Sequence, residues 1–254
     1  MVRMMTANIW GDYFGNPVAV REIGLYDALC AYHPDVLGLQ EVTTAWHQGE
    51  MFRRLAEDYV ILGDAPNYVP LAVKREFAVL DHGYELLTDT PDESKGITWV
   101  VVRDPQTDRV FGVCNTHFWW KAGPEHDVIR LQNAAQLHTV MNKLAVRFGC
   151  PVFAFGDMNC TRESGVFAYY EQHGIRPLFD LAAEKDDISS HHGDPVADSS
   201  GTYHGHRTDR DQRASIDHMV AVGNGFAVRQ YRLVLDQSAL DATDHSPVYA
   251  DVIL

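Results

Sequence analysis

Polar side chains that could hold a metal ion or transfer a proton stand at the ends of short apolar runs in this sequence. They are Asn8, Gln40-Glu41, Asn115-Thr116-His117, Asp157-Met158-Asn159 and Asp244-His245, with Asp217 inside a further apolar run. Taken singly, each is commonly a turn residue or a solvated side chain. Taken together, they offer the carboxylate and amide oxygens that Mg²⁺ prefers, and histidines that exchange protons near neutral pH. The set therefore favours a metal site combined with an acid–base pair.

These side chains need a scaffold that brings distant strand ends together, and the apolar pattern predicts one. Short apolar runs predict strands at 2–9, 36–39, 77–80, 84–87, 97–102, 110–115, 152–155, 215–222, 227–235 and 248–253. The pattern predicts helices at 18–31, 46–55, 128–148 and 165–173, and a polar loop at 184–201. Because helices stand between strands, the fold class is α/β, with sheets covered by helices. Such folds gather their ligand sites at strand ends.

Length and charge limit the functions that this chain can have. It has 254 residues, 46% of them hydrophobic, without an internal repeat or a linker-like segment. It can bury a core without disulfides, and we expect one domain over residues 1–254. Lys and Arg number 21 against 35 Asp and Glu, a formal net charge of -14. This balance argues against non-specific nucleic-acid binding, which depends on neutralising phosphates, but it allows a local basic cleft.

The cysteines and the apolar segments suggest where the protein works. The four cysteines are Cys30, Cys114, Cys150 and Cys160, and none forms a C-x-x-C pair. We expect them to be reduced and mostly buried. No apolar stretch approaches the roughly 18 residues of a membrane span, and the first residues lack the pattern of a secretory signal. We therefore expect a cytoplasmic protein.

The ordered motifs resemble those of the endonuclease/exonuclease/phosphatase superfamily. In chain order they are Asn8, Leu39-Gln40-Glu41, Asn115-Thr116-His117, Gly156-Asp157-Met158-Asn159, Ile216-Asp217 and Asp244-His245-Ser246-Pro247. The segments 79–99 and 201–205 are similar to a small bacterial branch of this family. The resemblance implies a four-layer α/β sandwich, with two mixed β-sheets packed face to face and helices outside. It also implies hydrolysis of a phosphoester by water, assisted by a divalent cation, Mg²⁺ or Mn²⁺.

The resemblance assigns a metal site to three residues. Glu41 would be the main metal ligand, Asn8 would lie beside it, and Asp244 would be a further ligand, directly or through water. Some relatives carry an acidic residue two positions after the first Asn, where this chain has Trp10. That difference disfavours a second metal ion, although the number of ions stays open.

The resemblance assigns the proton transfers to five other residues. Asp157 would orient or activate the attacking water, and Asn159 would position it. His245 would contact the phosphate and transfer a proton, while Asp217 would fix the orientation of its ring. His117 would donate a hydrogen bond to a phosphate oxygen or protonate the leaving group.

Substrate contacts are harder to assign from the sequence. Trp119 and Lys121 closely follow His117, so we expect them at the rim of the site, although either neighbouring Trp could instead pack in the core. Arg130, in the following helix, and His204 are further candidates. The pair His191-His192 is expected in a solvated loop, because its spacing does not suit zinc.

We therefore expect a metal-dependent phosphoesterase, a phosphodiesterase or a phosphatase, acting on a small or medium substrate. The alternative is a DNA or RNA nuclease of the same fold, which the net charge does not favour. A catalytically silent binding protein is the least favoured option, because the whole residue set is present. The substrate, the metal and the oligomeric state stay open.

Overall fold

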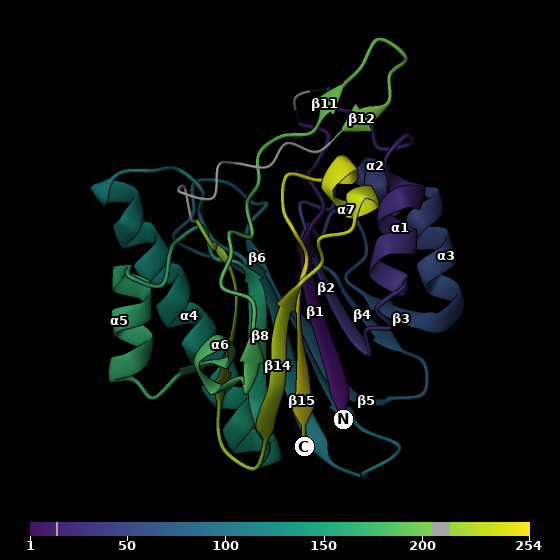
Figure 1. Cartoon of the computed structure of the whole chain (residues 1–254). Coiled ribbons are helices and arrows are strands. Elements are labelled where there is room, and N and C mark those ends of the chain that lie inside the picture. The colour runs from purple at the N-terminus through teal and green to yellow at the C-terminus, as the bar shows by residue number, and fades with distance from the viewer. Residues whose placement is uncertain (14, 205–213) are drawn as a thin grey trace.

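Two β-sheets face each other at the centre of the molecule, and helices cover the outer face of each (Figure 1). A computed structural model describes residues 1–13, 15–204 and 214–254. The first sheet has the spatial order β10 (Glu184–Lys185), β14 (Ala227–Leu233), β15 (Val248–Ile253), β1 (Val2–Asn8), β2 (Val36–Gln40), β4 (Leu71–Lys74) and β3 (Tyr59–Leu62). The second has the order β5 (Ala78–Leu86), β6 (Gly96–Arg103), β7 (Val110–His117), β8 (Val152–Asp157), β13 (Asp217–Val222) and β9 (Arg176–Pro177). A short ribbon pairs β11 (Val196–Ala197) with β12 (Tyr203–His204).

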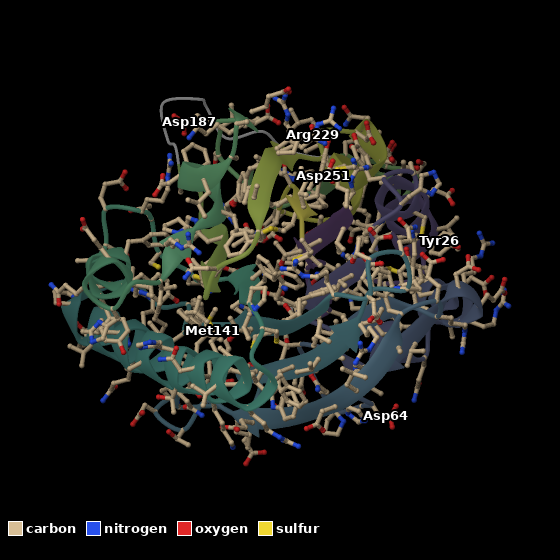
Figure 2. All side chains as sticks on the ribbon, turned by 90° about the horizontal axis from the view of Figure 1, so that it is seen from below. Tyr26, Asp64, Met141, Asp187, Arg229 and Asp251 are labelled. Carbon is tan, nitrogen blue, oxygen red and sulfur yellow. The ribbon has the colours of Figure 1, made fainter. Side chains whose placement is uncertain are left out.

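Three apolar cores hold the layers together. Side chains from both sheets fill the space between them, as the view along the strands shows (Figure 2). The helices that cover the first sheet are α1 (Glu22–Cys30), α2 (Thr44–His47), α3 (Glu50–Asp58) and α7 (Gln237–Ala242). The helices that cover the second sheet are α4 (Pro124–Phe148) and α5 (Gly165–Gln172), while α6 (Leu178–Leu181) packs near β13 and β14. The predicted four-layer α/β sandwich is confirmed.

A buried polar link joins the two sheets directly beneath their functional edge. The Asn115 amide donates to the backbone carbonyls of Leu39 and Pro70, at 2.8 Å each. Its carbonyl oxygen accepts a hydrogen bond of 2.6 Å from Gln40. A Cβ at Gly38 would collide with the Asn115 side chain, so glycine is what allows this close approach. The link fixes the relative position of β2 and β7, whose ends carry polar residues.

The register of the second sheet places functional side chains opposite one another. β7 and β8 are parallel, with His117 opposite Asp157, and β13 runs antiparallel to β8, with Asp217 opposite Asp157. Gly156 has a φ of 147°, and a Cβ there would collide with the carbonyl oxygen of Thr116. Only glycine fits this position, which sets the direction of the backbone just before Asp157.

The observed helices and strands differ from the predicted ones where tertiary contacts determine the local structure. The strands predicted at 77–80 and 84–87 form one strand, β5, with a bulge between Val79 and Asp81. The helix predicted at 46–55 is divided into α2 and α3, because the backbone of Gly49 is extended. The sequence pattern also misses β3, β4, β9, β10, β11, β12, α6 and α7, which are short and depend on packing against their neighbours. Two of these strands, β10 and β11, lie in the segment 184–201 that was predicted as a polar loop.

Two other expectations concern the cysteines and the apolar segments. All four cysteines are free thiols, as predicted, and three of them are buried. Within the described residues, no helix is long and apolar enough to cross a membrane.

Candidate active site

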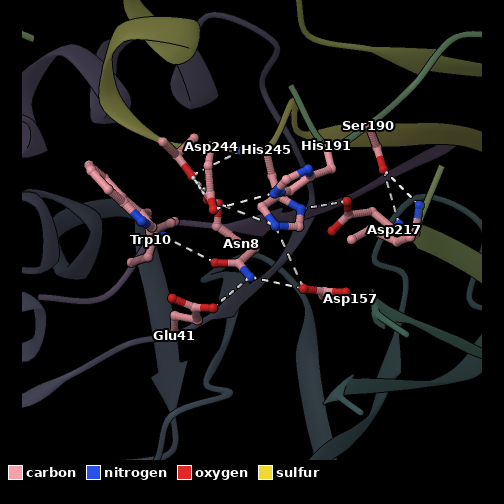
Figure 3. A network of polar contacts seen from close by, with 12 residues as sticks. Asn8, Trp10, Glu41, Asp157, Ser190, His191, Asp217, Asp244 and His245 are labelled. Atoms are coloured by element: carbon pink, nitrogen blue, oxygen red, sulfur yellow. Dashed lines mark hydrogen bonds and ion pairs between the residues drawn. The ribbon is translucent and has the colours of Figure 1, made fainter. Parts of the chain in front are cut away.

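Strand ends bring the predicted side chains to one edge of the two sheets. The parallel strands β1 and β2 end at Asn8 and directly before Glu41, and the parallel strands β7 and β8 end at His117 and Asp157. The antiparallel strand β13 begins at Asp217, beside Asp157. Since the carboxyl ends of parallel strands meet at one edge, residues distant in the sequence converge there. This edge lies at the top of Figure 1 and is enlarged in Figure 3.

The amide of Asn8 links the two carboxylates at the base of the site (Figure 3). Its nitrogen donates to Glu41 Oε1 at 3.1 Å and to Asp157 Oδ2 at 3.0 Å. Its oxygen accepts a hydrogen bond of 3.0 Å from the backbone N–H of Trp10. Glu41 Oε2 accepts a further bond of 2.9 Å from the backbone of Gly11. Asn8 thus holds two negative groups together, and its role as a metal ligand stays a prediction.

His245 and Asp217 form a buried pair. Nδ1 of His245 lies 2.7 Å from Asp217 Oδ2, and both side chains are almost fully buried. Burial alone would lower the pKa of His245, but the carboxylates of Asp217 and Asp244 raise it well above its ordinary value. Burial would raise the pKa of Asp217, but the His245 charge holds it below its ordinary value. His245 is therefore a cation at neutral pH, and its Nε2 points toward Asp157 at 3.7 Å.

Asp157 is a buried carboxylate with an unusual affinity for protons. Burial raises its pKa to about 6, although the nearby His245 charge opposes the rise. Oδ2 of Asp157 lies 3.5 Å from Nε2 of His117. A carboxylate with a pKa near neutrality can take up and release a proton under ordinary conditions.

Three of the five non-glycine residues with positive φ in the described part of the chain lie at this edge. Trp10, Glu41 and Asn159 have φ values of 56°, 62° and 49°, in the left-handed region that non-glycine residues rarely adopt. Such conformations persist where the surroundings impose them, and they cluster at functional sites. The backbone N–H of Asn159 donates to Asp157 Oδ1 at 2.9 Å, and its side chain donates to the carbonyl of Phe118 at 3.1 Å. The turn thereby holds Asn159 beside Asp157.

The sequence analysis missed Lys95, a buried lysine that faces the site. Its amine lies 3.0 Å from both ring nitrogens of His117, and the residue is 5% exposed. Burial lowers the pKa of Lys95, while the charges of Glu41 and Asp157 oppose that shift. Burial, and then the Lys95 charge, lower the pKa of His117 well below its ordinary value, so this imidazole is neutral. No sequence signal marks Lys95, which stands between a turn and the start of β6.

The prediction of a solvated loop at His191-His192 was wrong. Backbone hydrogen bonds tie this segment to the residues around His245, just before β15, because the His192 N–H donates to the Asp244 carbonyl and the Ser246 N–H donates to the Ser190 carbonyl. His192 is buried, and the His191 ring packs edge-on against that of His245 at 4.8 Å. The Ser190 hydroxyl accepts hydrogen bonds from the backbone at 216 and 217. The segment therefore supports the His245–Asp217 pair.

Several of these polar side chains line a cavity of about 410 Å³. Its walls include Glu41, Lys95, His117, Asp157, Asn159, Asp244 and His245, and its rim includes Trp10, Tyr13, Asp92, Trp120, His191 and Asp194. Such a volume suits a small molecule. Trp120 is 56% exposed and is the tryptophan of its pair that faces the cavity.

None of the four predicted substrate contacts lines this cavity. Trp119 is buried, and its indole donates to His126. Lys121 lies near the Trp119 and Trp120 rings. Arg130 is also buried, and its guanidinium binds the carbonyls of Trp119 and Lys121, so it has a structural role. His204 is tied to Asp198 on the outer ribbon, with 3.1 Å between Nε2 and Oδ2. Contacts with neighbouring segments hold these four side chains outside the cavity.

The donor set fits a hard divalent cation. Four carboxylates gather here, from Glu41, Asp157, Asp217 and Asp244, and among the described residues the cations that line the cavity are Lys95 and His245. These two cations offset at most half of the carboxylate charge. In the part of the chain that the structure describes, two trios have ligand atoms within 4.8 Å of one another, namely His191, Asp244 and His245, and Asp157, Asp217 and His245. Both include His245, which as an imidazolium has no free ring nitrogen for a metal, so the carboxylates are the candidate ligands. Oxygen-rich sites with residual negative charge suit Mg²⁺ or Mn²⁺.

Comparisons with known proteins place this geometry in a family. The model of the endonuclease/exonuclease/phosphatase family matches residues 5–245. An endonuclease/exonuclease/phosphatase from Bacteroides vulgatus has a TM-score of 0.80 at 21% identity, covering 100% of this chain and 98% of that chain. A mannosyl-6-phosphatase from Bacteroides thetaiotaomicron has a TM-score of 0.74 at 16% identity, covering 100% of both chains. D. rerio TDP2, complexed with a single-strand DNA product, has a TM-score of 0.73 at 15% identity, covering 100% of this chain and 99% of that chain.

A search of curated proteins finds no match. At these identities the solved structures establish the fold, whereas the family model rests on the sequence itself. It spans nearly the whole chain and includes every motif that gathers at the strand ends except Ser246-Pro247. The chain belongs to the endonuclease/exonuclease/phosphatase family.

Proposed function

We propose that this protein is a divalent-metal-dependent hydrolase of phosphoester bonds, a phosphatase or a phosphodiesterase. The observation that carries the proposal is the convergence, in one cavity, of a carboxylate cluster with the His245 cation and Lys95. A phosphoester needs positive charge around its oxygens and a carboxylate beside the attacking water. The family and the mannosyl-6-phosphatase with the same fold support this reading.

Glu41, with Asn8 and Asp244 beside it, would hold the cation. When bound, the cation would stabilise the negative charge that develops on the phosphoryl oxygens. Asn8 keeps Glu41 close to Asp157 through its two hydrogen bonds. The metal site and the water-activating carboxylate therefore share one positioning residue.

The chain's own groups divide the proton transfers between them. Asp157, with its pKa of about 6, accepts a proton from water, and Asn159 orients that water. His245, held as a cation by Asp217, donates to the phosphate oxygens. Lys95 has no carboxylate within ion-pair distance among the described residues, so the phosphate supplies its counter-charge.

Hydrolysis is expected to require added Mg²⁺ or Mn²⁺ and to stop in excess chelator. The test uses nitrophenyl phosphate and its bis-ester, with thermal melting as a second readout. A cation at 100 times its Kd stabilises the folded state by about 2.7 kcal/mol, and Glu41→Gln is expected to remove most of this shift. Turnover of the monoester alone identifies a phosphatase, and turnover of the diester alone identifies a phosphodiesterase. Full activity in chelator, or a melting shift that survives Glu41→Gln, would contradict the assignment.

A nuclease of the same fold is the second candidate, supported by exposed Trp120 at the cavity rim, where a base could stack. It predicts cleavage of oligonucleotides that falls steeply as salt increases. The net charge of -14 and the carboxylates at the rim oppose a long polyanion. Cleavage that is insensitive to salt, or absent, removes this candidate.

Lys95→Met is expected to lower kcat/KM about 100-fold while leaving the fold intact. The variant loses a positive group aimed at the phosphate. Its stability is preserved because the substitution also removes the desolvation cost of a buried charge that has no ion-pair partner among the described residues. The measurement is kcat/KM together with the melting temperature. Lys121→Met, which changes a lysine outside the cavity, is the control. Equal losses in both variants would contradict this role.

A further inference from the structure

A second hollow of about 670 Å³ adjoins the active-site cavity and has a different lining. Tyr13, Asp92 and Ser94 line both hollows, so the two are continuous. We call the second hollow the tyrosine groove. It is defined by Tyr13, Tyr68, Tyr84, Asp64, Asp92 and Glu93.

Exposed aromatic rings concentrate at these two hollows. In the described part of the chain, the exposed aromatic side chains are Tyr13, Tyr84 and Trp120, at 50%, 41% and 56%. Tyr13 and Trp120 line the active-site cavity, and Tyr13 and Tyr84 line the tyrosine groove. Exposed aromatic surface beside a site marks a place for a ligand to pack.

Two glycines connect these rings to the catalytic groups. The Tyr13 ring lies across Gly11, whose N–H donates to Glu41, so that a Cβ at Gly11 would collide with the ring. The Tyr84 ring lies across Gly96, next to Lys95, and a Cβ at Gly96 would be 2.6 Å from it. The groove therefore begins close to Glu41 and Lys95. If a phosphate is bound in the cavity, a group esterified to it that extends toward the groove would contact the tyrosines.

The charge of the groove limits its occupant. Among the described residues, its lining has three carboxylates, from Asp64, Asp92 and Glu93, and no Lys or Arg. An anionic occupant such as a polynucleotide would be repelled. Partial burial, and then neighbouring acidic groups, raise the pKa values of Tyr13 and Tyr84. Their hydroxyls stay protonated, so the groove offers hydrogen-bond donors as well as acceptors.

We propose that the tyrosine groove binds a neutral, hydroxyl-rich group of sugar size that is esterified to the phosphate. A sugar presents C–H faces to aromatic rings, and its hydroxyls both donate to carboxylates and accept from phenols. A cation would use the carboxylates and the ring faces but not the phenol donors. The proposal rests on the proposed function and names the leaving group of that reaction.

The test compares three primary alkyl phosphates that differ in the leaving group, namely glucose 6-phosphate, ethyl phosphate and choline phosphate. Phosphate release is measured with Mn²⁺ present. We expect kcat/KM for the sugar ester to exceed that for ethyl phosphate at least tenfold, and Tyr84→Ala to lower this ratio about tenfold. Tyr84→Phe keeps the ring and is expected to lower the ratio less.

The matched control is Leu80→Ala. Leu80 lies on the same strand as Tyr84, is 42% exposed and lines neither hollow, so the ratio is expected to stay unchanged. A ratio that does not respond to Tyr84→Ala overturns the proposal. Preference for choline phosphate over the sugar ester also overturns it, in favour of a cationic group.

A binding measurement separates failure of this proposal from failure of the proposed function. Saturation-transfer NMR follows the binding of methyl α-glucopyranoside and methyl α-mannopyranoside, which have no phosphoester. Binding that Tyr84→Ala weakens and Leu80→Ala leaves intact supports the groove, even if no ester is hydrolysed. If esters are hydrolysed but neither glycoside binds, the proposed function stands and the groove proposal is wrong.

Discussion

Replacing Asp157 with asparagine is expected to lower kcat/KM at least 1,000-fold and yet to stabilise the metal-free protein above pH 6. The loss of activity follows because the amide cannot take a proton from water. The gain in stability follows from the burial that raises the pKa of Asp157 to about 6. The same burial that suits this carboxylate to catalysis makes its ionised form costly.

Whether stability rises or falls with pH depends on the Asp157 pKa in the folded and the unfolded protein. Unfolded chains release the Asp157 proton near pH 4, whereas the folded protein holds it until about pH 6. Stability is therefore lost as the pH rises from about 4 to 6, by about 3 kcal/mol. Asparagine removes this loss but disturbs the hydrogen bonds from Asn8 and Asn159, so we expect a net gain of about 1 kcal/mol at pH 8.

Melting temperatures in chelator at pH 4.5 and pH 8 provide the measurement. Asp251→Asn is the matched control, since Asp251 is equally buried but ion-paired to Arg3, which holds its pKa low against the effect of burial. That variant should lose stability at pH 8 and keep its activity. Substantial turnover in Asp157→Asn would remove Asp157 as the base, and destabilisation at pH 8 would contradict the cost assigned to its charge.

The sequence could predict the fold and the centre of the site for one reason. The motifs stand at the ends of apolar runs, and strands paired in parallel bring such ends to one edge. Asn8, Glu41 and Asp157 are therefore gathered although they are far apart in the chain. His245 joins them because it stands just before β15, which runs antiparallel to β1. The family resemblance, confirmed by the match over residues 5–245, added the four-layer arrangement.

The rest depends on loops and on packing that no local pattern records. Lys95 reaches the cavity because β6 begins at the next residue, and Trp119 is buried because α4 packs over it. By its sequence, the loop that carries His191 resembles a solvated segment. Only the structure shows the backbone hydrogen bonds that join it to the residues around His245. The tyrosine groove joins rings from three separate segments, which sequence spacing alone does not relate.

Replacing Asp217 with asparagine is expected to lower kcat/KM about 100- to 1,000-fold and to shift the basic limb of the pH–rate profile to lower pH. In the parent protein, the carboxylates of Asp217 and Asp244 keep the pKa of His245 well above its ordinary value against the effect of burial. Without the Asp217 charge, His245 loses its proton at lower pH and no longer donates to phosphate there. The loss of rate follows because the ring is also no longer oriented by the 2.7 Å contact.

The stability of this variant has its own pH dependence. A histidine whose pKa is raised by folding stabilises the protein fully below its unfolded pKa of about 6.5, and this contribution is lost as the pH rises through the folded value. Asp217→Asn should therefore lower stability most in mildly acidic buffer. The loss should fall short of the 3–5 kcal/mol typical of a broken buried pair, because Asp244 and Asp157 still face the imidazolium.

The pH–rate profile separates this role from a merely structural one. A variant that is only less stable should lose activity at every pH, whereas loss of the Asp217 charge should move the basic limb. Asp35→Asn breaks a half-buried pair with Lys74 away from the site and should leave the profile in place. His245 titration followed by NMR supplies the direct measurement. If the His245 pKa were unchanged in Asp217→Asn, another group would hold the proton, and Asp244, 3.8 Å from Nε2, would be the first to examine.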